Sequence, residues 1–397
     1  MAFRQGNGNR GHQVFEALFW LSLLLVGYVY VGYPALMALL SLSPRRVRKN
    51  PAHRPSVSIL IPAHNEAAVI EAGLRNKLAL DYPSELLEIR VVSDESSDET
   101  DAIVQRVAAE STVPIHLVRQ TPRQGKTAGI NTLAAQAQGE ILAFADANSL
   151  WADDALAALV ANFDDPEVGY VTGKMVYTQA DGSLVGDGCS AYMRFENWLR
   201  EQETAVGSIV GVDGGIDAMR KALFTPLRPE QLPDFVQPLE VAEQGYRVVY
   251  EPTAILKEPA LDDSDSEFAM RVRVTLRALW ALNDMAHLMN PARHGLFALQ
   301  LISHKLLRYL AFVPLTVLAV TSLILLNDGM LYLLAAVGQI AFYVLAWQGH
   351  RATRSGGTAS VWQTVPYYFT LLNVACARAF AAYVRGERKA VWTPRKG

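Results

Sequence analysis

Val57-Ser-Ile-Leu-Ile-Pro-Ala-His-Asn-Glu66 is the stretch that sets the fold of the middle of this chain. Its first five residues have the apolar, β-branched character of a short buried strand, and a helical stretch is expected after them at 65–80. The alternation continues with expected strands at 89–93, 115–118, 141–144, 168–172 and 247–250 and expected helices at 99–109 and 126–137. Strands that alternate with helices of about 10–15 residues indicate βαβ units and an open parallel sheet.

Three aspartates are expected to mark the functional edge of that sheet. Asp94 and Asp146 each follow an apolar run, and we also place Asp234 just past such a run, ahead of Gly245-Tyr-Arg-Val-Val-Tyr250. In an open α/β sheet, ligands bind beyond the carboxyl ends of the strands. Three carboxylates at that edge are suited to a nucleotide, a divalent metal and a general base.

The composition favours a membrane protein and gives no case for a nucleic-acid partner. Charged residues make up 19% of the 397 residues, below the roughly 25% of soluble domains, and the apolar residues gather at the two ends. The formal net charge is -3, whereas nucleic-acid binding requires a basic domain. Cys189 and Cys376 lie far apart and are expected as free thiols.

The N-terminal region predicts a membrane anchor. After a tail at 1–13, residues 14–42 are apolar apart from Glu16, which is longer than the about 20 residues of a spanning helix and too long for a signal peptide. A basic linker follows at 43–55. By the positive-inside rule, its charge places the middle domain, 56–260, in the cytoplasm of a multi-pass inner or plasma membrane protein.

The C-terminal region predicts further membrane segments. Residues 309–348 are expected to form a transmembrane hairpin that turns at Asn327-Asp-Gly329. A weaker segment at 361–384 is a fourth transmembrane helix or a re-entrant one, and both alternatives stay open. A fourth span would put the basic tail, 385–397, on the outer side, against the charge rule.

Polar motifs follow the first two expected strands. Asn65 and Glu66 lie in Pro62-Ala-His-Asn-Glu66, and Asp94-Glu-Ser-Ser-Asp-Glu-Thr100 comes after the second strand. Taken singly, the first motif is a helix cap and the second a solvated loop. Because both stand at one edge of one sheet, a nucleotide pocket is an equal alternative.

Two further motifs suit an anion and a metal ion. Gly125 and Lys126 stand at an expected helix N-terminus, where unpaired N–H groups favour an anion, although the full phosphate-loop spacing is absent. Asp146-Ala-Asn148 offers two oxygen donors that suit Mg²⁺ or Mn²⁺. The alternative for this motif is a cap for a helix at 151–159.

This series of motifs, followed by Asp234-Phe235, resembles the family 2 inverting glycosyltransferases. More narrowly, it is similar to their membrane-embedded branch, which includes hyaluronan, chitin, cellulose and poly-N-acetylglucosamine synthases. The resemblance covers about Ser56 to Arg308. It implies a GT-A-type, Rossmann-like α/β domain for a nucleotide-sugar, flanked by N- and C-terminal transmembrane helices and an amphipathic interface helix.

The resemblance implies a donor site and a reaction. It assigns Asn65, Glu66 and Asp94 to the nucleoside of the donor, by default a UDP-sugar, and it places Lys126 near that donor. The implied reaction transfers the sugar, with inversion, to a polysaccharide or lipid-linked acceptor for cell-surface polysaccharide synthesis.

The resemblance also implies the catalytic and acceptor positions. It assigns Mg²⁺ or Mn²⁺ to Asp146 with Asn148, at a position where many relatives have a second aspartate, and the general base to Asp234. A glycine turn beside the acceptor falls at Gly214 and Gly215.

Interface helices are expected at 264–308, beginning with an amphipathic helix at 265–289. Its arginines contact either lipid head groups or the donor diphosphate, and Arg273 is the candidate for the second role. Processive synthases carry Q-x-x-R-W, but 270–274 here reads Met-Arg-Val-Arg-Val, so the tryptophan that stacks on the acceptor is missing. Trp280, seven residues after Arg273, is a candidate replacement on the same helical face.

Two alternatives to a processive synthase follow from that departure. One is a transferase that adds a single sugar to a lipid carrier, and the other is a non-catalytic subunit that works with partner subunits of a polysaccharide export complex. A Rossmann oxidoreductase is disfavoured because G-x-G-x-x-G does not follow the first strand.

Overall fold

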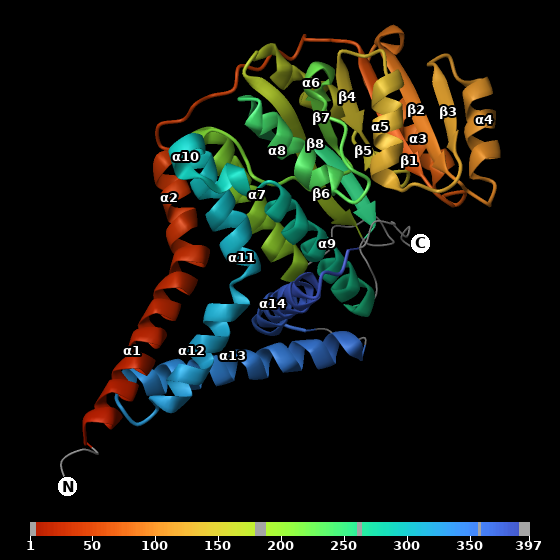
Figure 1. Ribbon diagram of the computed structural model, residues 1–397. Coiled ribbons are helices and arrows are strands. Elements are labelled where there is room, and N and C mark those ends of the chain that lie inside the picture. Colours follow the sequence, from red (N-terminus) through yellow and green to blue (C-terminus); the bar gives the residue numbers. More distant parts are fainter. Residues whose placement is uncertain (1–4, 179–187, 260–263, 356–358, 389–397) are drawn as a thin grey trace.

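The computed structural model describes residues 5–178, 188–259, 264–355 and 359–388, and it contains an α/β part above a helical part (Figure 1). The α/β part holds one eight-stranded sheet in the order β3-β2-β1-β4-β7-β6-β8-β5. Its strands are β1 Val57–Ala63, β2 Leu87–Asp94, β3 Ile115–Gln120, β4 Ile141–Phe144, β5 Leu150–Trp151, β6 Val168–Thr178, β7 Asp217–Arg220 and β8 Arg247–Pro259. Its helices are α3 Ile70–Leu78, α4 Thr100–Glu110, α5 Lys126–Gln136, α6 Ala155–Ala161 and α8 Pro233–Glu243.

The expected strands are all present, but the sheet is mixed and not wholly parallel. Strand β7 is antiparallel to both β4 and β6, and β5 is antiparallel to β8. The other pairs, β1 with β2 and β4, β2 with β3 and β6 with β8, are parallel. The two reversed strands are four and two residues long. They are too short to show an alternating pattern, which explains why the sequence did not reveal them.

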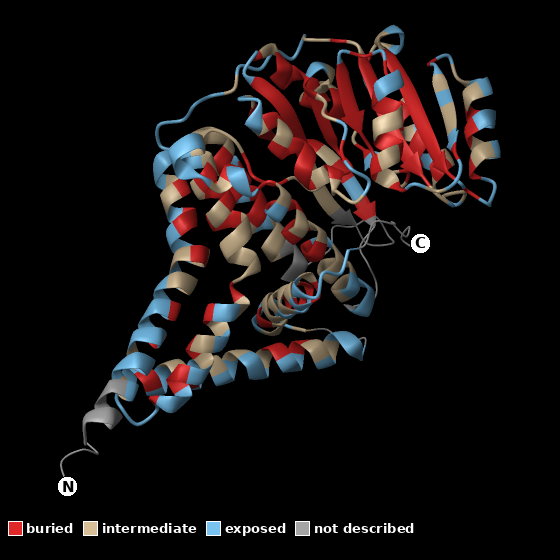
Figure 2. Ribbon diagram, viewed as in Figure 1, coloured by how far each residue is buried: buried red, intermediate tan, exposed pale blue. Residues whose placement is uncertain are grey.

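The sheet is buried on both faces (Figure 2). Ile59 and Ile61 belong to one apolar cluster, with α3, α4 and α6, whereas Leu60 belongs to the other, with α5. Successive side chains of a strand point to opposite faces, so a strand covered on both sides must be apolar at every position. This requirement accounts for the unbroken apolar run at 57–61.

The helical part begins with one long helix made of α1 Gln5–Gly27, a π-helical turn at Tyr28–Gly32 (η1) and α2 Tyr33–Leu40. After the sheet domain come α9 Ser264–Asp284, α10 Pro291–Gln300, the π-helical η6 Leu301–Leu306 and α11 Leu307–Tyr309. The chain ends with α12 Phe312–Ile324, α13 Met330–Arg354 and α14 Val361–Val384, and α7 Gly188–Val206 packs on α2 from within the α/β sequence. The short 3₁₀ turns are η2 Ser84–Leu86, η3 Asn162–Asp164, η4 Lys221–Leu223 and η5 Ala286–Met289.

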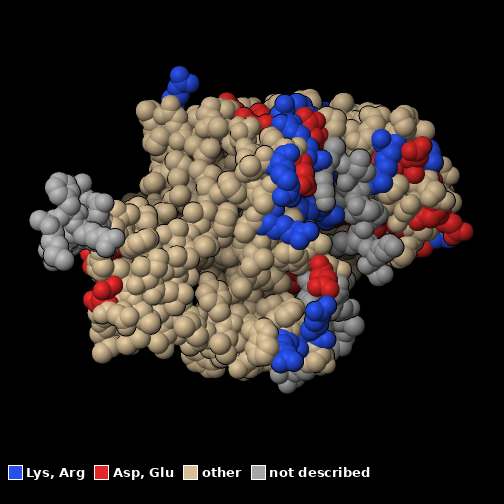
Figure 3. Space-filling model, turned by 60° about the horizontal axis from the view of Figure 1, so that its bottom comes forward, with Lys and Arg blue, Asp and Glu red and all other residues tan. Residues whose placement is uncertain are grey.

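Apolar side chains on these helices are exposed, which indicates association with a membrane. Leu21, Leu24 and Val31 are 64%, 68% and 67% exposed, and one face of the helical part carries almost no charged residues (Figure 3). Among the described residues, Gly11–Leu40 and Met330–Arg354 are long and apolar enough to cross a membrane. A third candidate is Pro291–Tyr309 taken together with Phe312–Ile324, a pair bent by 56°.

The expected hairpin and fourth span differ from the observed helices. Helix α12 has only 13 residues, fewer than the about 20 needed to span a bilayer alone. Helix α14 has 24 residues but is not among the candidate spans in the described part of the chain. It packs on α9 and α13. By length and apolar character, the described residues thus contain two candidate spans, or three if the bent pair is one span.

The basic linker binds the α/β domain. Arg45 pairs with Glu167 at 2.8 Å, Arg48 with Asp164 at 2.7 Å, and Lys49 with Glu251 at 2.6 Å. These ion pairs fasten the domain to the end of the long N-terminal helix. Cys376 is a free thiol, as expected, and the side chain of Cys189 lies outside the described residues.

Candidate active site

Lys126 joins two of the three predicted aspartates. Its Nζ lies 2.8 Å from Asp146 Oδ1 and 3.4 Å from Asp234 Oδ2, and its side chain is only 14% exposed. Burial disfavours the ammonium group, but the charges of Asp146 and Asp234 outweigh it and raise the pKa of Lys126 above its ordinary value. Residues far apart in the sequence thus form one compact group of charges at the carboxyl edge of the sheet.

Asp234 reaches this group from a helix and not from a strand end, so the expected position just past an apolar run is wrong. It lies in the first turn of α8, where Pro233 occupies an early helical position that needs no N–H donor. The carbonyl of Gln231 accepts hydrogen bonds from Thr127 Oγ1 and Arg277, each at 2.9 Å. The start of α8 is therefore held by α5 and α9.

The predicted glycine turn lies directly against both carboxylates. Gly214 and Gly215 have φ of +82° and +76°, a conformation that favours glycine. A Cβ at Gly214 would lie 2.9 Å from Asp234 Cγ, and one at Gly215 would lie 3.5 Å from Asp146 Oδ2. The two glycines leave the space in which the carboxylates sit.

Gly214→Ala is expected to lower kcat by roughly tenfold to a hundredfold, because the new methyl group displaces Asp234 and the backbone is strained by about 1–2 kcal/mol. Steady-state kinetics with the sugar donor measures this effect. Gly245→Ala is the matched control, since Gly245 has φ +87° and nothing within 4 Å of the added Cβ. Equal losses of kcat in the two variants would show that backbone strain alone causes the effect. The contact with the Asp234 carboxylate would then have no part in it.

Asp146 lies in a turn that helix α3 supports. The Asp146 N–H donates to Ser149 Oγ at 3.2 Å, and the Ser149 N–H donates to the Asp146 carbonyl at 3.1 Å. Lys77 Nζ donates to the Ser149 carbonyl at 2.6 Å from a fully buried side chain. Because β5 follows this turn and α6 begins only at Ala155, the alternative role of Asp146-Ala-Asn148 as a helix cap is wrong. The sequence analysis missed Lys77, which looks like any other lysine in a helix.

Lys77→Met is expected to lower kcat/KM by about tenfold, because the lost charge-assisted hydrogen bond loosens the turn that carries Asp146. Lys221→Met is the control, since Lys221 also binds a backbone carbonyl, that of Ala137. A wild-type kcat/KM in Lys77→Met would show that the turn does not need this support.

Lys77→Met should also change how the stability of the protein depends on pH. Burial lowers the pKa of Lys77 from 10.5 to about 7, so the unfolded chain binds more protons between these values. The free energy of unfolding therefore gains a contribution that rises as pH increases from about 7 to 10.5. Thermal melts at several pH values should show a smaller rise for Lys77→Met than for the wild type.

The loops after β1 and β2 are tied together, as expected for two motifs at one edge. Asn65 has φ +55°, its Oδ1 accepts from the Ser97 N–H at 2.8 Å, and the Glu66 N–H donates to Thr100 Oγ1 at 2.9 Å. The helix expected from 65 begins only at Ile70, because residues 65–69 form this loop. Asn65 therefore presents its amide to the second loop and does not cap a helix.

Asp94 organises the segment that leads to Lys126. Its carboxylate accepts hydrogen bonds from the N–H groups of Gln124 and Gly125 at 2.8 Å and 2.9 Å, and from Gln120 Nε2 at 2.6 Å. Gly125, with φ +91°, then starts α5 at Lys126. The helix start predicted at Gly125 and Lys126 is present, and Lys126 meets carboxylates there. Anion binding at this helix start stays a prediction.

The donor set around Asp146 fits a divalent metal that is held mainly by a ligand. Burial and the charges of Asp146 and Asp98 raise the pKa of Glu66 to about 7, which shows that acidic groups face one another here. The described residues contain no group of three or more His, Cys, Asp or Glu side chains arranged to hold a metal. Mg²⁺ commonly takes only one or two carboxylates and completes its shell with phosphate oxygens and water, so the Asp146 carboxylate fits an ion that a bound diphosphate also holds.

Comparison with known families identifies the domain that carries these residues. Residues 58–224 match the model of glycosyl transferase family 2. This segment is a glycosyltransferase domain that is similar to family 2. It contains every predicted site residue except Asp234, Arg273 and Trp280.

Similar proteins agree with that assignment. A beta-monoglucosyldiacylglycerol synthase of Trichormus variabilis is 31% identical over 205 residues, which are 51% of this chain and 44% of that protein. The probable glycosyltransferase YdaM of Bacillus subtilis is 30% identical over 181 residues, 45% of this chain and 43% of that protein. The chain thus aligns with less than half the length of these two relatives.

A solved structure resembles the chain over almost all of its length. The mannosyltransferase PcManGT of Pyrobaculum calidifontis, in complex with GDP-Man and Mn²⁺, has a TM-score of 0.69 and 25% identity, covering 91% of this chain and 99% of that one. The likeness therefore extends beyond the glycosyltransferase domain into the flanking helices.

Helix α9, which follows the glycosyltransferase domain, reaches the site with Arg277. The electrostatic influence of Asp234 on Arg277 and the hydrogen bond from Arg277 to Gln231 place it beside the start of α8. The sequence favoured Arg273, one turn earlier, because Arg273 aligns with the arginine of Q-x-x-R-W. Helical spacing alone does not distinguish Arg273 from Arg277, because both lie on the same amphipathic helix.

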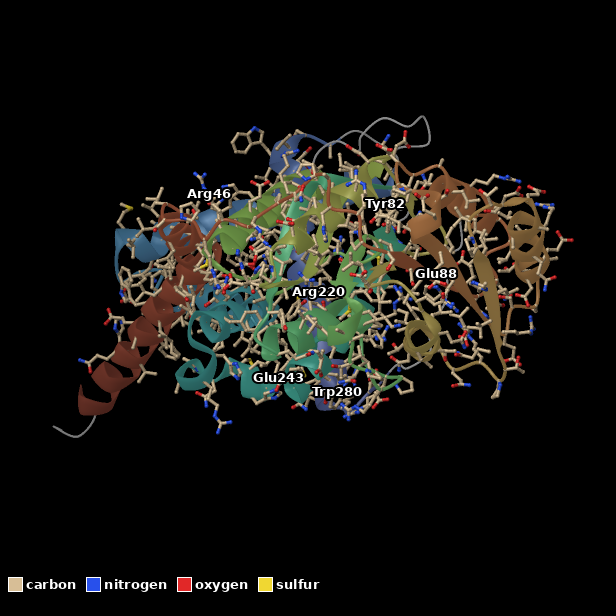
Figure 4. All side chains as sticks on the ribbon, turned by 90° about the horizontal axis from the view of Figure 1, so that it is seen from above. Arg46, Tyr82, Glu88, Arg220, Glu243 and Trp280 are labelled. Carbon is tan, nitrogen blue, oxygen red and sulfur yellow. The ribbon has the colours of Figure 1, made fainter. Side chains whose placement is uncertain are left out.

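Trp280 packs on the C-terminal segment of the chain and also lines a small pocket with Gln231 and Arg277. Its ring packs against Tyr383 with 4.6 Å between ring centres and lies under Arg388, and its Nε1 donates to the Glu387 carbonyl at 2.9 Å. Figure 4 shows it at the edge of the molecule seen from above. Lys126, Asp146, Asp234, Gly214 and Gly215 form one group. Trp280 lies near Arg277, which reaches the start of α8.

Proposed function

We propose that this protein is a membrane-anchored inverting glycosyltransferase that adds a sugar from a nucleotide-sugar to a lipid-linked or glycan acceptor. The observation that carries the proposal is the contact of Lys126 with both Asp146 and Asp234. It joins a candidate metal ligand and a cation for the leaving diphosphate, both in the segment that matches family 2, to a candidate base just beyond that segment. UDP- and GDP-sugars are both candidate donors, the latter because PcManGT was solved with GDP-Man.

The chemistry follows from the placement of these charges. Asp234 accepts the proton of an acceptor hydroxyl while the hydroxyl oxygen attacks the anomeric carbon of the donor sugar. The bond from that carbon to the diphosphate breaks in the same step. Lys126 and Arg277 offset the charge that develops on the departing diphosphate. Mg²⁺ or Mn²⁺ at Asp146 and Asn148 supplies Lewis-acid stabilisation of that group when bound. A single displacement of this kind inverts the anomeric configuration.

The proposed reaction takes place at the cytoplasmic face of the membrane, an orientation that the basic residues after the long N-terminal helix support. Arg45, Arg48 and Lys49 stand between the long N-terminal helix and the glycosyltransferase domain, and the charge rule keeps such residues inside. A multi-pass arrangement would add α13 and the bent helix pair as further spans.

Addition of a single sugar is favoured over processive synthesis. The tryptophan of Q-x-x-R-W is missing, and at most three candidate spans occur in the described residues. Relatives that match include a monoglucosyldiacylglycerol synthase and a glucosyltransferase whose name specifies a diphosphate-undecaprenol acceptor, from Campylobacter jejuni. Export partner subunits are needed only if the product is a polysaccharide.

Release of nucleotide from purified protein tests the proposal. Full-length protein in detergent is incubated with UDP-, GDP- and dTDP-sugars and with Mg²⁺ or Mn²⁺, with and without a membrane-lipid extract as acceptor. We expect release from one donor and its loss with EDTA. No release from any donor in folded protein, together with no donor binding, would contradict the proposed activity.

A further inference from the structure

A cavity of about 480 Å³ lies between the glycosyltransferase domain and the membrane helices. Its walls come from α7, the loop at Val212 and Asp213, α9, η6 with α11, and α14. Its volume falls within the range of small-molecule sites, about 300–1,000 Å³. Figure 1 shows these elements meeting where the α/β part joins the helical part.

The cavity adjoins the proposed catalytic base. Val212 and Asp213 line it, and the next residue, Gly214, packs against Asp234. Arg200 holds Asp213 through two hydrogen bonds of 2.6 Å each, which fixes this short stretch between the cavity and the base. A molecule bound in the cavity therefore needs to extend only past the glycine turn to present a hydroxyl to Asp234.

The polar wall of the cavity is basic near that turn. Arg308 binds Glu196 at 2.8 Å, while Lys305 Nζ lies 3.8 Å from the same carboxylate, too far for a hydrogen bond. His304 Nε2 also contacts Glu196, at 2.9 Å, so one carboxylate faces three basic side chains. A Cβ at Gly211 would lie 2.2 Å from Lys305 Nζ, so the ammonium group rests against the residue that precedes Val212. The side chain of Lys305 is only 11% exposed, and a buried cation of this kind favours an anionic ligand.

The opposite wall of the cavity is apolar and belongs to helices of the membrane part. Val365, Phe369 and Leu372 of α14 and Tyr30 of the long N-terminal helix line it. Val374, two residues beyond Leu372, is 51% exposed on the outside of α14. A ligand with a polar head and an apolar chain matches both walls.

We propose that this cavity binds the acceptor, a lipid whose hydroxyl-bearing head group is joined to its chain through a phosphate or diphosphate. The phosphate lies by Lys305 and Arg308, the apolar chain lies against α14, and the head group extends past Gly214 to Asp234. This inference rests on the proposed function and specifies its acceptor. A glycerophospholipid and a polyprenyl diphosphate sugar share the required chemistry.

Binding of defined lipids to the full-length protein in a neutral detergent tests the inference. Native mass spectrometry or a fluorescence titration compares phosphatidylglycerol and a polyprenyl diphosphate sugar with uncharged diacylglycerol and polyprenol. We expect binding of one phosphate-bearing lipid with a Kd at least about tenfold lower than that of its uncharged counterpart. Which of the two phosphate lipids binds distinguishes the two sources. Equal affinity for charged and uncharged lipids would overturn the assignment of a phosphate.

Two substitutions locate the site, each with a matched control. Lys305→Met should weaken binding of the phosphate lipid by about tenfold, whereas Arg293→Met, at an exposed position on α10, should not. Leu372→Trp fills the apolar wall and should weaken binding at least as much, whereas Val374→Trp, on the outer face of the same helix, should not. If Lys305→Met does not fold, the tryptophan pair decides the location. A wild-type affinity for the phosphate lipid in Leu372→Trp would overturn the assignment of the lipid to this cavity.

Donor binding measured in the same samples separates this inference from the proposed function. Loss of lipid binding with intact donor binding in the variants supports the cavity as the acceptor site. Lipid selectivity without any donor binding in the wild type would leave the cavity as a lipid site and reject the glycosyltransferase activity. Donor turnover without lipid selectivity would support the glycosyltransferase activity and reject the cavity as a site for a phosphate-bearing lipid.

Discussion

Asp234→Asn is expected to lower kcat by about a thousandfold while donor affinity changes no more than a few-fold. The amide keeps the size of the side chain but cannot accept the proton of the acceptor hydroxyl, and general-base catalysis contributes about 10²–10⁴-fold. Asp234 lies 3.4 Å from Lys126 at the start of α8, so the change leaves the contact of Lys126 with Asp146 in place. Steady-state kinetics and donor titration measure the two effects separately.

Asp154→Asn is the control for this variant, because Asp154 is an exposed residue of the same domain that immediately precedes α6. It should behave as the wild type. If Asp234→Asn kept a kcat within about threefold of the wild type, Asp234 would not be the base, and a catalytic role for the Lys126 group would lose its main support.

Asp146→Asn is expected to weaken the binding of Mn²⁺ and to lower kcat/KM by at least about a hundredfold. A neutral amide is a poorer ligand for a hard cation than a carboxylate, and the metal's stabilisation of the leaving group amounts to several kcal/mol. The loss of this carboxylate also removes the 2.8 Å contact of Lys126. Electron paramagnetic resonance of Mn²⁺ in the presence of the donor nucleotide measures metal binding, and activity at increasing Mn²⁺ measures the kinetic effect.

A wild-type Mn²⁺ affinity in Asp146→Asn would place the metal elsewhere. Activity that is lost but restored at high Mn²⁺ would agree with a weakened site. Asp154→Asn again provides the same change of charge at an exposed position of the domain.

The sequence predicted the strands at the centre of the sheet because their burial on both faces requires unbroken apolar runs. It also predicted that Asp94 and Asp146 stand at one edge of the sheet, and they do because β2 and β4 are parallel neighbours of β1. The resemblance to family 2 indicated Gly214 and Gly215 as a turn beside the acceptor. The structure places these glycines against the carboxylates of Asp234 and Asp146.

The sequence did not reveal contacts that depend on tertiary packing. Asp234 lies on a helix because Pro233 and the hydrogen bonds of Gln231 start α8 there. Pro233 is a local sign of a helix start, whereas the hydrogen bonds of Gln231 depend on α5 and α9 packing beside it. Lys77 supports the Asp146 turn from α3, an arrangement visible only once the helix packs on the sheet. Trp280 shares a helix with Arg273, yet its ring packs on the C-terminal helix.

The anomeric configuration of the product tests the central claim most directly, which is that one base, Asp234, drives a single displacement. The donor that releases nucleotide is used with its lipid acceptor, and nuclear magnetic resonance reads the new linkage from the coupling of the anomeric proton. We expect a configuration opposite to that of the sugar in the donor. Retention of the donor configuration would require a second displacement or a different mechanism, and it would contradict the role assigned to Asp234.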